Sequence, residues 1–372
     1  MRKLQRILFL IINSLFVAKY SIRFGYNPFV ITCLYCLFAE FTFWALSKKN
    51  NLRIKETKRA YFSLMILIFV AILLLNNFVD PLKLQVDRWS AIHNFIQNLF
   101  KGIYPYSAHT HLGGYASPFP VWQIFHIPFY LLGNVGLGML FSAILLSVFL
   151  VWFFENYHFA FYFIVLIVIS PAFWYEVAVR SDLIYNFIFC LMAIAFAHKQ
   201  KYTIQNQTFR LGILCGLFLS TRISVIIPFA IFLYSDFIRS SFKQKLIFIS
   251  VSFFVFAISF LPFIIWNFNM LFFSKFNPFL LQTRQGSLIE MILIIGLAIY
   301  FSIKWKGNFS LYSAYTSITL VTLVIISFLH RMISDNFVNG LFDSAFDLTY
   351  FTMALPFIIF ALTNTDIEEL KN

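Results

Sequence analysis

The chain has 372 residues, of which 60% are apolar and 12% are charged, and its mean hydropathy is +0.81. A soluble globular domain has about 45–50% apolar and about 25% charged residues. These proportions therefore exclude a soluble enzyme, a disordered chain and a fibrous repeat. They predict an all-α, polytopic membrane protein.

The formal net charge is +13, from 28 basic and 15 acidic residues. In a soluble protein this excess would suggest a nucleic-acid partner. In a membrane protein it is expected without one, because basic residues collect in the short loops on the cytoplasmic side. We therefore expect a lipid bilayer as a partner and no nucleic acid.

Long apolar runs predict about 12–13 membrane segments. The first run begins at Ile7, after three basic residues, and we expect an uncleaved first helix. The run 209–238 is too long for one helix and carries Arg222 in its middle, so it predicts two short helices that meet near this residue. The other runs lie at 27–46, 61–78, 118–134, 136–154, 159–175, 182–198, 245–267, 288–303, 309–329 and 345–363.

Basic residues set the expected orientation. They concentrate at both termini and in four loops, at 47–60, 199–210, 239–245 and 304–306. The positive-inside rule places these loops, the N-terminus and the C-terminus in the cytoplasm of a multi-pass protein of the plasma (inner) membrane. The connections at 79–117, 176–182, 268–287 and 330–344 then face outside, as does the turn near Arg222.

This orientation requires one incomplete crossing. Three apolar runs, at 118–134, 136–154 and 159–175, separate two loops that we place on the same face. Three full crossings would put those loops on opposite faces, so one run must be partial, which is possible where its backbone is buried in protein. We expect a half-helix within 155–178, because Pro171 interrupts that stretch.

The segment 79–117 is much longer than a connection between two helices needs. Residues 88–101 have the pattern of an amphipathic helix that lies along the membrane interface. Asp87 directly precedes this helix, where a carboxylate can be an N-cap, a general base or both. Asp80 stands beside Pro81, and we expect a structural role for it.

Charged residues gather in the turns that we place outside. Charges at the edge of apolar segments usually face a cavity, and arginine binds phosphate through two hydrogen bonds. We therefore expect Arg180, Arg222, His330 and Arg331 to bind a phosphate and Asp182 to contact a substrate. The alternative is a set of structural ion pairs, such as Arg180 with Asp182.

Aromatic residues near the outer face have two interpretations. Trp122 and Trp174 are expected to anchor helices at the membrane interface. Tyr104 and Tyr106 either do the same or line a binding site.

The stretch from Asp87 through RWSAIHNFIQNLFK to Gly102 and IYPY, followed by SPFPV, resembles the first outer loop of GT-C-fold glycosyltransferases. PAFWYEVAVRSDLIYN and LGILCGLFLSTRISVIIPF are similar to later outer turns of that family. The nearest group is polyprenyl-phosphate-mannose-dependent mannosyltransferases. The resemblance implies one integral-membrane domain over 1–372, with a helix pair (1–60), a GT-C-like catalytic module (61–265) and C-terminal helices (266–372).

The resemblance also implies a chemistry. Asp87 would be the catalytic base of an inverting hexosyltransferase, which moves a hexose, with mannose as the guess, from a polyprenyl-phosphate sugar donor to a glycan or glycolipid acceptor. Arg88, Tyr104, Tyr106 and Asp182 would contact the substrates. The chain has no Asp-x-Asp pair, which favours a lipid-linked donor over a nucleotide-sugar. We expect no cofactor and no metal site, although a divalent metal stays open.

Two other functions remain as alternatives. One is a polysaccharide polymerase or ligase of the outer leaflet, although such enzymes carry their large loop late in the chain. The other is a secondary transporter, although the sequence shows no internal repeat.

Overall fold

The computed structural model describes residues 1–48, 54–283, 287–335, 342 and 346–369. Within these residues the chain is all-α, and its only β-type pairing is an isolated bridge between His109 and Tyr115. The helices are α1 (Arg2–Arg23), α2 (Pro28–Lys48), α3 (Ile54–Phe78), α4 (Arg88–Phe100), α5 (Pro120–Phe125), α6 (Ile127–Leu131), α7 (Leu137–Phe154), α8 (Tyr157–Val168), α9 (Pro171–Ala178), α10 (Leu183–Lys199), α11 (Ile204–Leu219), α12 (Ile226–Arg239), α13 (Phe242–Phe273), α14 (Pro278–Thr283), α15 (Leu288–Lys304), α16 (Phe309–Asp335) and α18 (Leu355–Glu369). Short 3-10 turns are η1 (Pro81–Lys83), η2 (Pro105–Ser107), η3 (Ile223–Val225) and η4 (Leu348–Met353).

Helix length and composition make this a multi-pass membrane protein. Among the described residues, six helices are long and apolar enough to cross a bilayer: α1, α2, α3, α7, α13 and α16. A seventh candidate is the pair α8 and α9, which is bent by 68°. The predicted number of 12–13 segments is therefore too high, because several apolar runs fold into helices shorter than a spanning helix, such as α12 with 14 residues.

The run 118–134 is one of those that cannot cross. It forms α5 with 6 residues and α6 with 5 residues, and six residues of helix span only about 9 Å. Only α7 and the bent pair α8 and α9 then remain as candidate crossings between the segment 79–117 and the turn 176–182, which we expect on one face. Two crossings return the chain to the same face, so no further partial run is needed. The half-helix that we expect within 155–178 stays a prediction; in that stretch α8 and α9 meet at the bend, directly before Pro171.

Two compact units make up the described chain. The first unit contains residues 1–75, 140–178 and 307–372, and the second contains residues 76–139 and 179–306. The single domain with three parts that we expect from the sequence stays a prediction.

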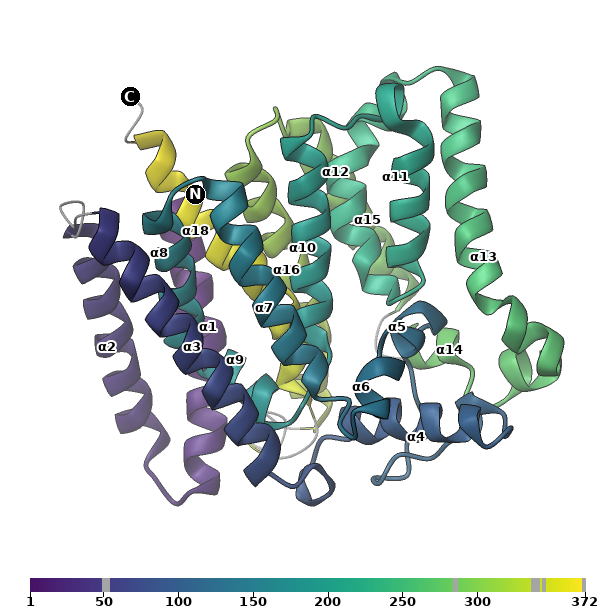
Figure 1. Ribbon diagram of the computed structural model, residues 1–372, viewed down its shortest axis with the longest axis horizontal. Helices are drawn as coiled ribbons and strands as arrows, with labels where there is room; N and C mark the ends of the chain where they lie inside the picture. The colour runs from purple at the N-terminus through teal and green to yellow at the C-terminus, as the bar shows by residue number, and fades with distance from the viewer. Residues whose placement is uncertain (49–53, 284–286, 336–341, 343–345, 370–372) are drawn as a thin grey trace. The chain divides into compact units, whose positions relative to one another are not determined.

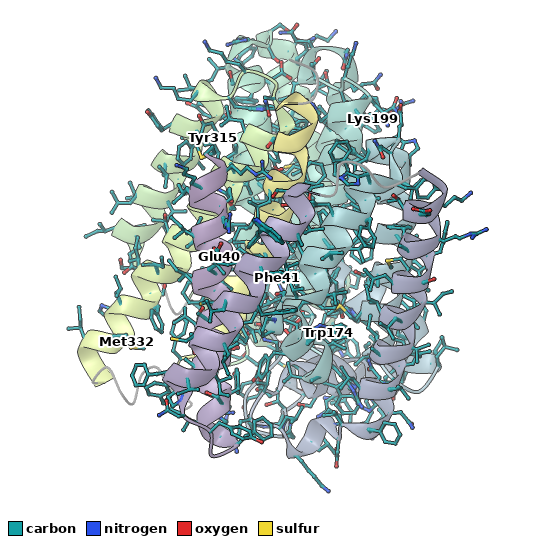
Figure 2. All side chains as sticks on the ribbon, turned by 90° about the vertical axis from the view of Figure 1, so that its left-hand side faces the viewer. Glu40, Phe41, Trp174, Lys199, Tyr315 and Met332 are labelled. Carbon is teal, nitrogen blue, oxygen red and sulfur yellow. The ribbon has the colours of Figure 1, made fainter. Side chains whose placement is uncertain are left out.

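In the first unit, α1 packs against α2, α9 and α18, and α16 packs against α18. Arg6 on α1 pairs with Glu40 on α2, while the neighbouring Phe41 is 62% exposed (Figure 2). Trp174, which we expected to anchor a helix at the interface, donates its indole N–H to the carbonyl oxygen of Val168 across the bend (2.8 Å). The exposed apolar surface of α2 fits contact with lipid.

In the second unit, α11 packs closely against α13. Two glycines of α11, Gly212 and Gly216, make this possible. A Cβ atom at Gly216 would lie 2.5 Å from the carbonyl oxygen of Ser252 on α13, so any larger residue would push the two helices apart.

The second unit has a basic end and an opposite end that carries the predicted site. Helices α10, α12 and α15 finish at Lys199, Arg239 and Lys304. At the other end, Asp182 precedes α10, and Arg222 lies in the turn between α11 and α12, as the sequence predicts. Helix α4 runs crosswise to α10, α11, α12 and α13 near that end (Figure 1).

Candidate functional site

The site is built on α4, which forms where the amphipathic pattern predicts it and buries Ile92, Phe95 and Ile96. Asp87 occupies the N-cap position, yet its side chain makes no capping hydrogen bond. Its Oδ2 atom instead accepts a hydrogen bond from the Thr110 hydroxyl group (2.7 Å). The carboxylate is therefore directed at the later part of the segment 79–117 and not at the helix backbone.

Thr110 belongs to a tight hairpin, residues 109–115, that lies against Asp87. Its backbone N–H donates to the Gly114 carbonyl oxygen (2.9 Å), and its hydroxyl oxygen accepts from the Gly114 N–H (2.9 Å). A Cβ atom at Gly114 would lie 2.9 Å from the Asp87 Oδ2 atom. Only glycine lets the hairpin approach the carboxylate this closely.

His111 fastens the hairpin to both sides of Asp87. Its Nδ1 atom lies 2.7 Å from the Ser90 Oγ atom, and its Nε2 atom lies 2.9 Å from the Leu84 carbonyl oxygen. His109 instead pairs with Tyr115. Within the described residues, no three His, Cys, Asp or Glu side chains gather as a metal site would require.

A buried ion cluster includes Arg88, the residue after Asp87. Asp182, which is 0% exposed, pairs with Arg222, and its Oδ1 atom lies 3.9 Å from the Arg88 Nη1 atom. The Trp122 indole N–H donates to Asp182 Oδ2 (2.7 Å). Burial alone would raise the pKa of Asp182, but the cations of Arg222 and Arg88 outweigh it and hold that pKa below its ordinary value.

Asp182, Arg88 and Arg222 by themselves, one carboxylate and two guanidinium groups, have a formal charge of +1. Buried charges are costly unless they are compensated. Within the part of the chain that the structure describes, the Nε atom of Arg222 and the Oδ1 atom of Asp182 are both buried without a hydrogen-bond partner. An excess positive charge with a spare buried donor is the electrostatic condition for binding an anion.

Trp122 is 3% exposed, so it is not the interface anchor that we expected. His126 fixes it from behind: the His126 Nδ1 atom lies 2.6 Å from the Trp122 carbonyl oxygen, and the Nε2 atom contacts the Tyr185 hydroxyl group. Burial lowers the pKa of His126 to about 4. The neutral ring can therefore donate from Nδ1 to the carbonyl group and accept from Tyr185.

Arg180 contacts the end of α3, and its part in phosphate binding stays a prediction. It donates to the carbonyl oxygens of Asn76 and Val79 at the end of α3 and lies over the Trp89 ring (5.8 Å). The alternative ion pair of Arg180 with Asp182 is wrong, because Asp182 pairs with Arg222 and Arg88. Arg180 thus fixes the start of the segment 79–117.

Two of the remaining predicted residues, Tyr104 and Tyr106, lie in the apolar core of the second unit. Tyr106 is 0% exposed, donates its hydroxyl hydrogen to the Pro118 carbonyl oxygen (3.2 Å) and packs in the core with Phe95 and Phe263, and Tyr104 is 6% exposed. His330 is exposed on α16 in the first unit. The Arg331 side chain lies outside the described residues.

An apolar groove of about 500 Å³ opens between α11, α12 and α13. Its lining includes Leu219, Leu233 and Phe253, and it reaches Phe119 and Ile223, the residue after Arg222. Gln282 on α14 braces this end: its Oε1 atom accepts from the Ile223 N–H (2.7 Å), and its Nε2 group donates to the Ser117 carbonyl oxygen (2.7 Å).

Sequence reasoning missed Trp122, Thr110, His111 and the groove. Comparison of the chain with protein-family models, with curated proteins and with solved structures gives no significant match. Function is therefore argued from the site alone.

Proposed function

We propose that this protein is an integral-membrane glycosyltransferase that moves a hexose from a polyprenyl-phosphate donor to a glycan or glycolipid acceptor. The observation that carries the proposal is the sequence of groups in the second unit: an oriented carboxylate at Asp87, a buried cationic pair at Arg88 and Arg222, and an apolar groove that begins at Ile223. In that order, these groups would accept a proton from an acceptor hydroxyl, bind a phosphate and hold a prenyl chain.

The chemistry is a single displacement. Asp87 takes the proton of the acceptor hydroxyl group as that oxygen forms a bond to the anomeric carbon. The bond from the anomeric carbon to the phosphate oxygen breaks, and its electron pair stays on the lipid phosphate, where Arg88 and Arg222 stabilise the added negative charge. Attack on the face opposite the phosphate inverts the configuration.

The distribution of charge supports an outer-face site. The basic ends of α10, α12 and α15 lie away from Asp87 and Arg222, and the positive-inside rule assigns such ends to the cytoplasm. A prenyl chain in the groove would lie alongside α11, α12 and α13, while its phosphate would be at headgroup level, where cations favour it.

The test is sugar transfer by the purified protein in lipid. Radiolabelled polyprenyl-phosphate mannose and glucose are compared with nucleotide-sugars, with host membrane extract as the source of acceptors. We expect transfer from a lipid-linked donor that Asp87→Asn abolishes at unchanged protein level. Asp80→Asn is the matched control, because Asp80 is a nearby exposed carboxylate that caps η1. Full transfer by Asp87→Asn, or transfer from nucleotide-sugars only, contradicts the proposal.

A further inference from the structure

The side chain of Asp182 does not cap the helix that it precedes. It holds the N-cap position of α10, but its side chain makes no capping hydrogen bond. Its carboxylate is 0% exposed and meets groups from three other places in the chain: Arg88 at the start of α4, Trp122 on α5 and Arg222 before η3. A buried carboxylate that gathers two arginines has a role in arranging them.

The two oxygens of Asp182 are used unequally. Oδ2 accepts from both Trp122 and Arg222, whereas among the described residues Oδ1 accepts no hydrogen bond and faces Arg88 at 3.9 Å. Asp182 therefore holds Arg222 by a hydrogen bond and attracts Arg88 by its charge. An anion that enters between the two guanidinium groups competes with Asp182 for both of them.

Trp122 makes this arrangement rigid. Its carbonyl group is fixed by His126, its ring stacks on Phe125 (5.1 Å between centroids), and its N–H then points at Asp182 Oδ2. The carboxylate cannot follow Arg222 away from the cluster without breaking this hydrogen bond. The position of Arg222 is thus set by the Trp122–Asp182 pair.

We propose that Asp182, held by Trp122, is a positioning residue that keeps Arg88 and Arg222 together as one phosphate-binding pair and, as their internal counter-ion, weakens that pair's affinity so that the phosphate is released. The expected change in turnover rests on the proposed function. The expected change in phosphate binding does not depend on that function. The ligand class is a prenyl monophosphate, because Arg222 directly precedes Ile223, which lines the end of the apolar groove.

The test separates binding from turnover. Farnesyl phosphate is titrated against wild type, Asp182→Asn and Trp122→Phe, with farnesol as the uncharged probe. Asp236→Asn is the matched control, because it removes the same charge at the basic end of the second unit, where Asp236 accepts from the Ile204 N–H. Sugar transfer and unfolding temperature are measured on the same samples.

We expect Asp182→Asn to bind farnesyl phosphate about tenfold more tightly, because a nearby negative charge is gone, while farnesol binding is unchanged. The kcat for transfer should fall at least tenfold, because Arg222 has lost its anchor and the product phosphate leaves slowly. A loss of stability alone would not lower the dissociation constant and kcat together. Asp236→Asn should change neither value.

Unchanged or weaker binding of farnesyl phosphate by folded Asp182→Asn overturns the counter-ion role. If Asp182→Asn does not fold, Trp122→Phe decides, because it loosens Asp182 and keeps its charge. Unchanged kcat in Trp122→Phe then overturns the positioning role. If wild type transfers no sugar from any donor, the proposed function fails, and the binding measurements still decide whether Asp182 restrains an anion site.

Discussion

The Oγ1 atom of Thr110 lies 2.7 Å from the Oδ2 atom of Asp87, and this hydrogen bond fixes the orientation of the proposed base. The bond joins the start of α4 to the hairpin 109–115, through two residues of the segment 79–117 that are 23 positions apart. It explains why the carboxylate at a helix N-terminus does not cap the helix. The hairpin, rather than the helix, decides where that carboxylate points.

Thr110→Val removes this hydrogen bond at nearly constant volume. One such bond is worth about 1 kcal/mol, so we expect kcat to fall roughly fivefold with little change in the KM for the donor. Thr110→Ser keeps the hydroxyl group and should retain most of the activity. Initial rates of both variants check this, and equal rates in Thr110→Val and wild type would show that the bond does not orient the base.

Gly114→Ala places a Cβ atom 2.9 Å from the Asp87 Oδ2 atom, too close for the carboxylate to keep its position. We expect transfer to fall at least tenfold, because a displacement of about 1 Å at a reacting group has a large effect. Gly296→Ala on α15 is the control, since a Cβ atom there meets no atom within 4 Å. The unfolding temperature of both variants distinguishes displacement of the base from loss of the fold.

Arg222→Gln leaves the buried carboxylate of Asp182 without its closest cation. Removing one partner of a buried ion pair costs about 3–5 kcal/mol, so we expect a clear drop in unfolding temperature together with weaker binding of farnesyl phosphate. Arg88→Gln should weaken binding with a smaller loss of stability, because Arg88 lies 3.9 Å from Asp182. Arg210→Gln, at an exposed position, is the control for charge. Equal farnesyl phosphate affinity in wild type and Arg88→Gln would remove Arg88 from the phosphate site.

The groove predicts a dependence on the length of the prenyl chain. Ala230→Trp fills part of the groove, and we expect it to reduce transfer from a long-chain donor much more than from a two-isoprene donor. Ile265→Trp, at a position that is 76% exposed on α13 and outside the groove lining, is the matched control. Equal losses with both donors would argue that the prenyl chain lies elsewhere.

His126 predicts that acid destabilises the second unit. Burial lowers its pKa to about 4, although the Trp122 carbonyl group and Asp182 raise it, while Arg222 lowers it. In the unfolded chain the His126 ring binds a proton near its ordinary pKa of about 6.5. The contribution of the neutral, buried ring to the free energy of unfolding is therefore full above pH 6.5 and is lost as the pH falls toward 4. A shift of this size corresponds to about 3 kcal/mol.

Unfolding temperatures at pH 7.5 and pH 5 check this prediction. Wild type should lose stability between the two values, and His126→Gln should be less stable at pH 7.5 and lose less on acidification. The same loss in both proteins would assign the acid sensitivity to other groups.

Some of the site follows from local sequence. The apolar period of residues 88–101 is a property of neighbouring residues, so the helix and the place of Asp87 directly before it are predictable. The two short helices on either side of Arg222 follow in the same way from the length of the run. The burial of Tyr104 and Tyr106 did not follow from the sequence, because hydropathy does not tell a buried tyrosine from one that lines a site.

Composition by itself determined that this is an all-α, multi-pass membrane protein, because 60% apolar residues in long runs leave no soluble alternative. Only the tertiary structure decided that the run 118–134 does not cross and that Asp182 meets Arg222 and Trp122, which are 40 and 60 residues away. Ion pairs and hydrogen bonds depend on distances in space, and a spacing along the chain fixes such distances only within one helix. The partners of a charge in a connecting turn are therefore set by how the helices pack.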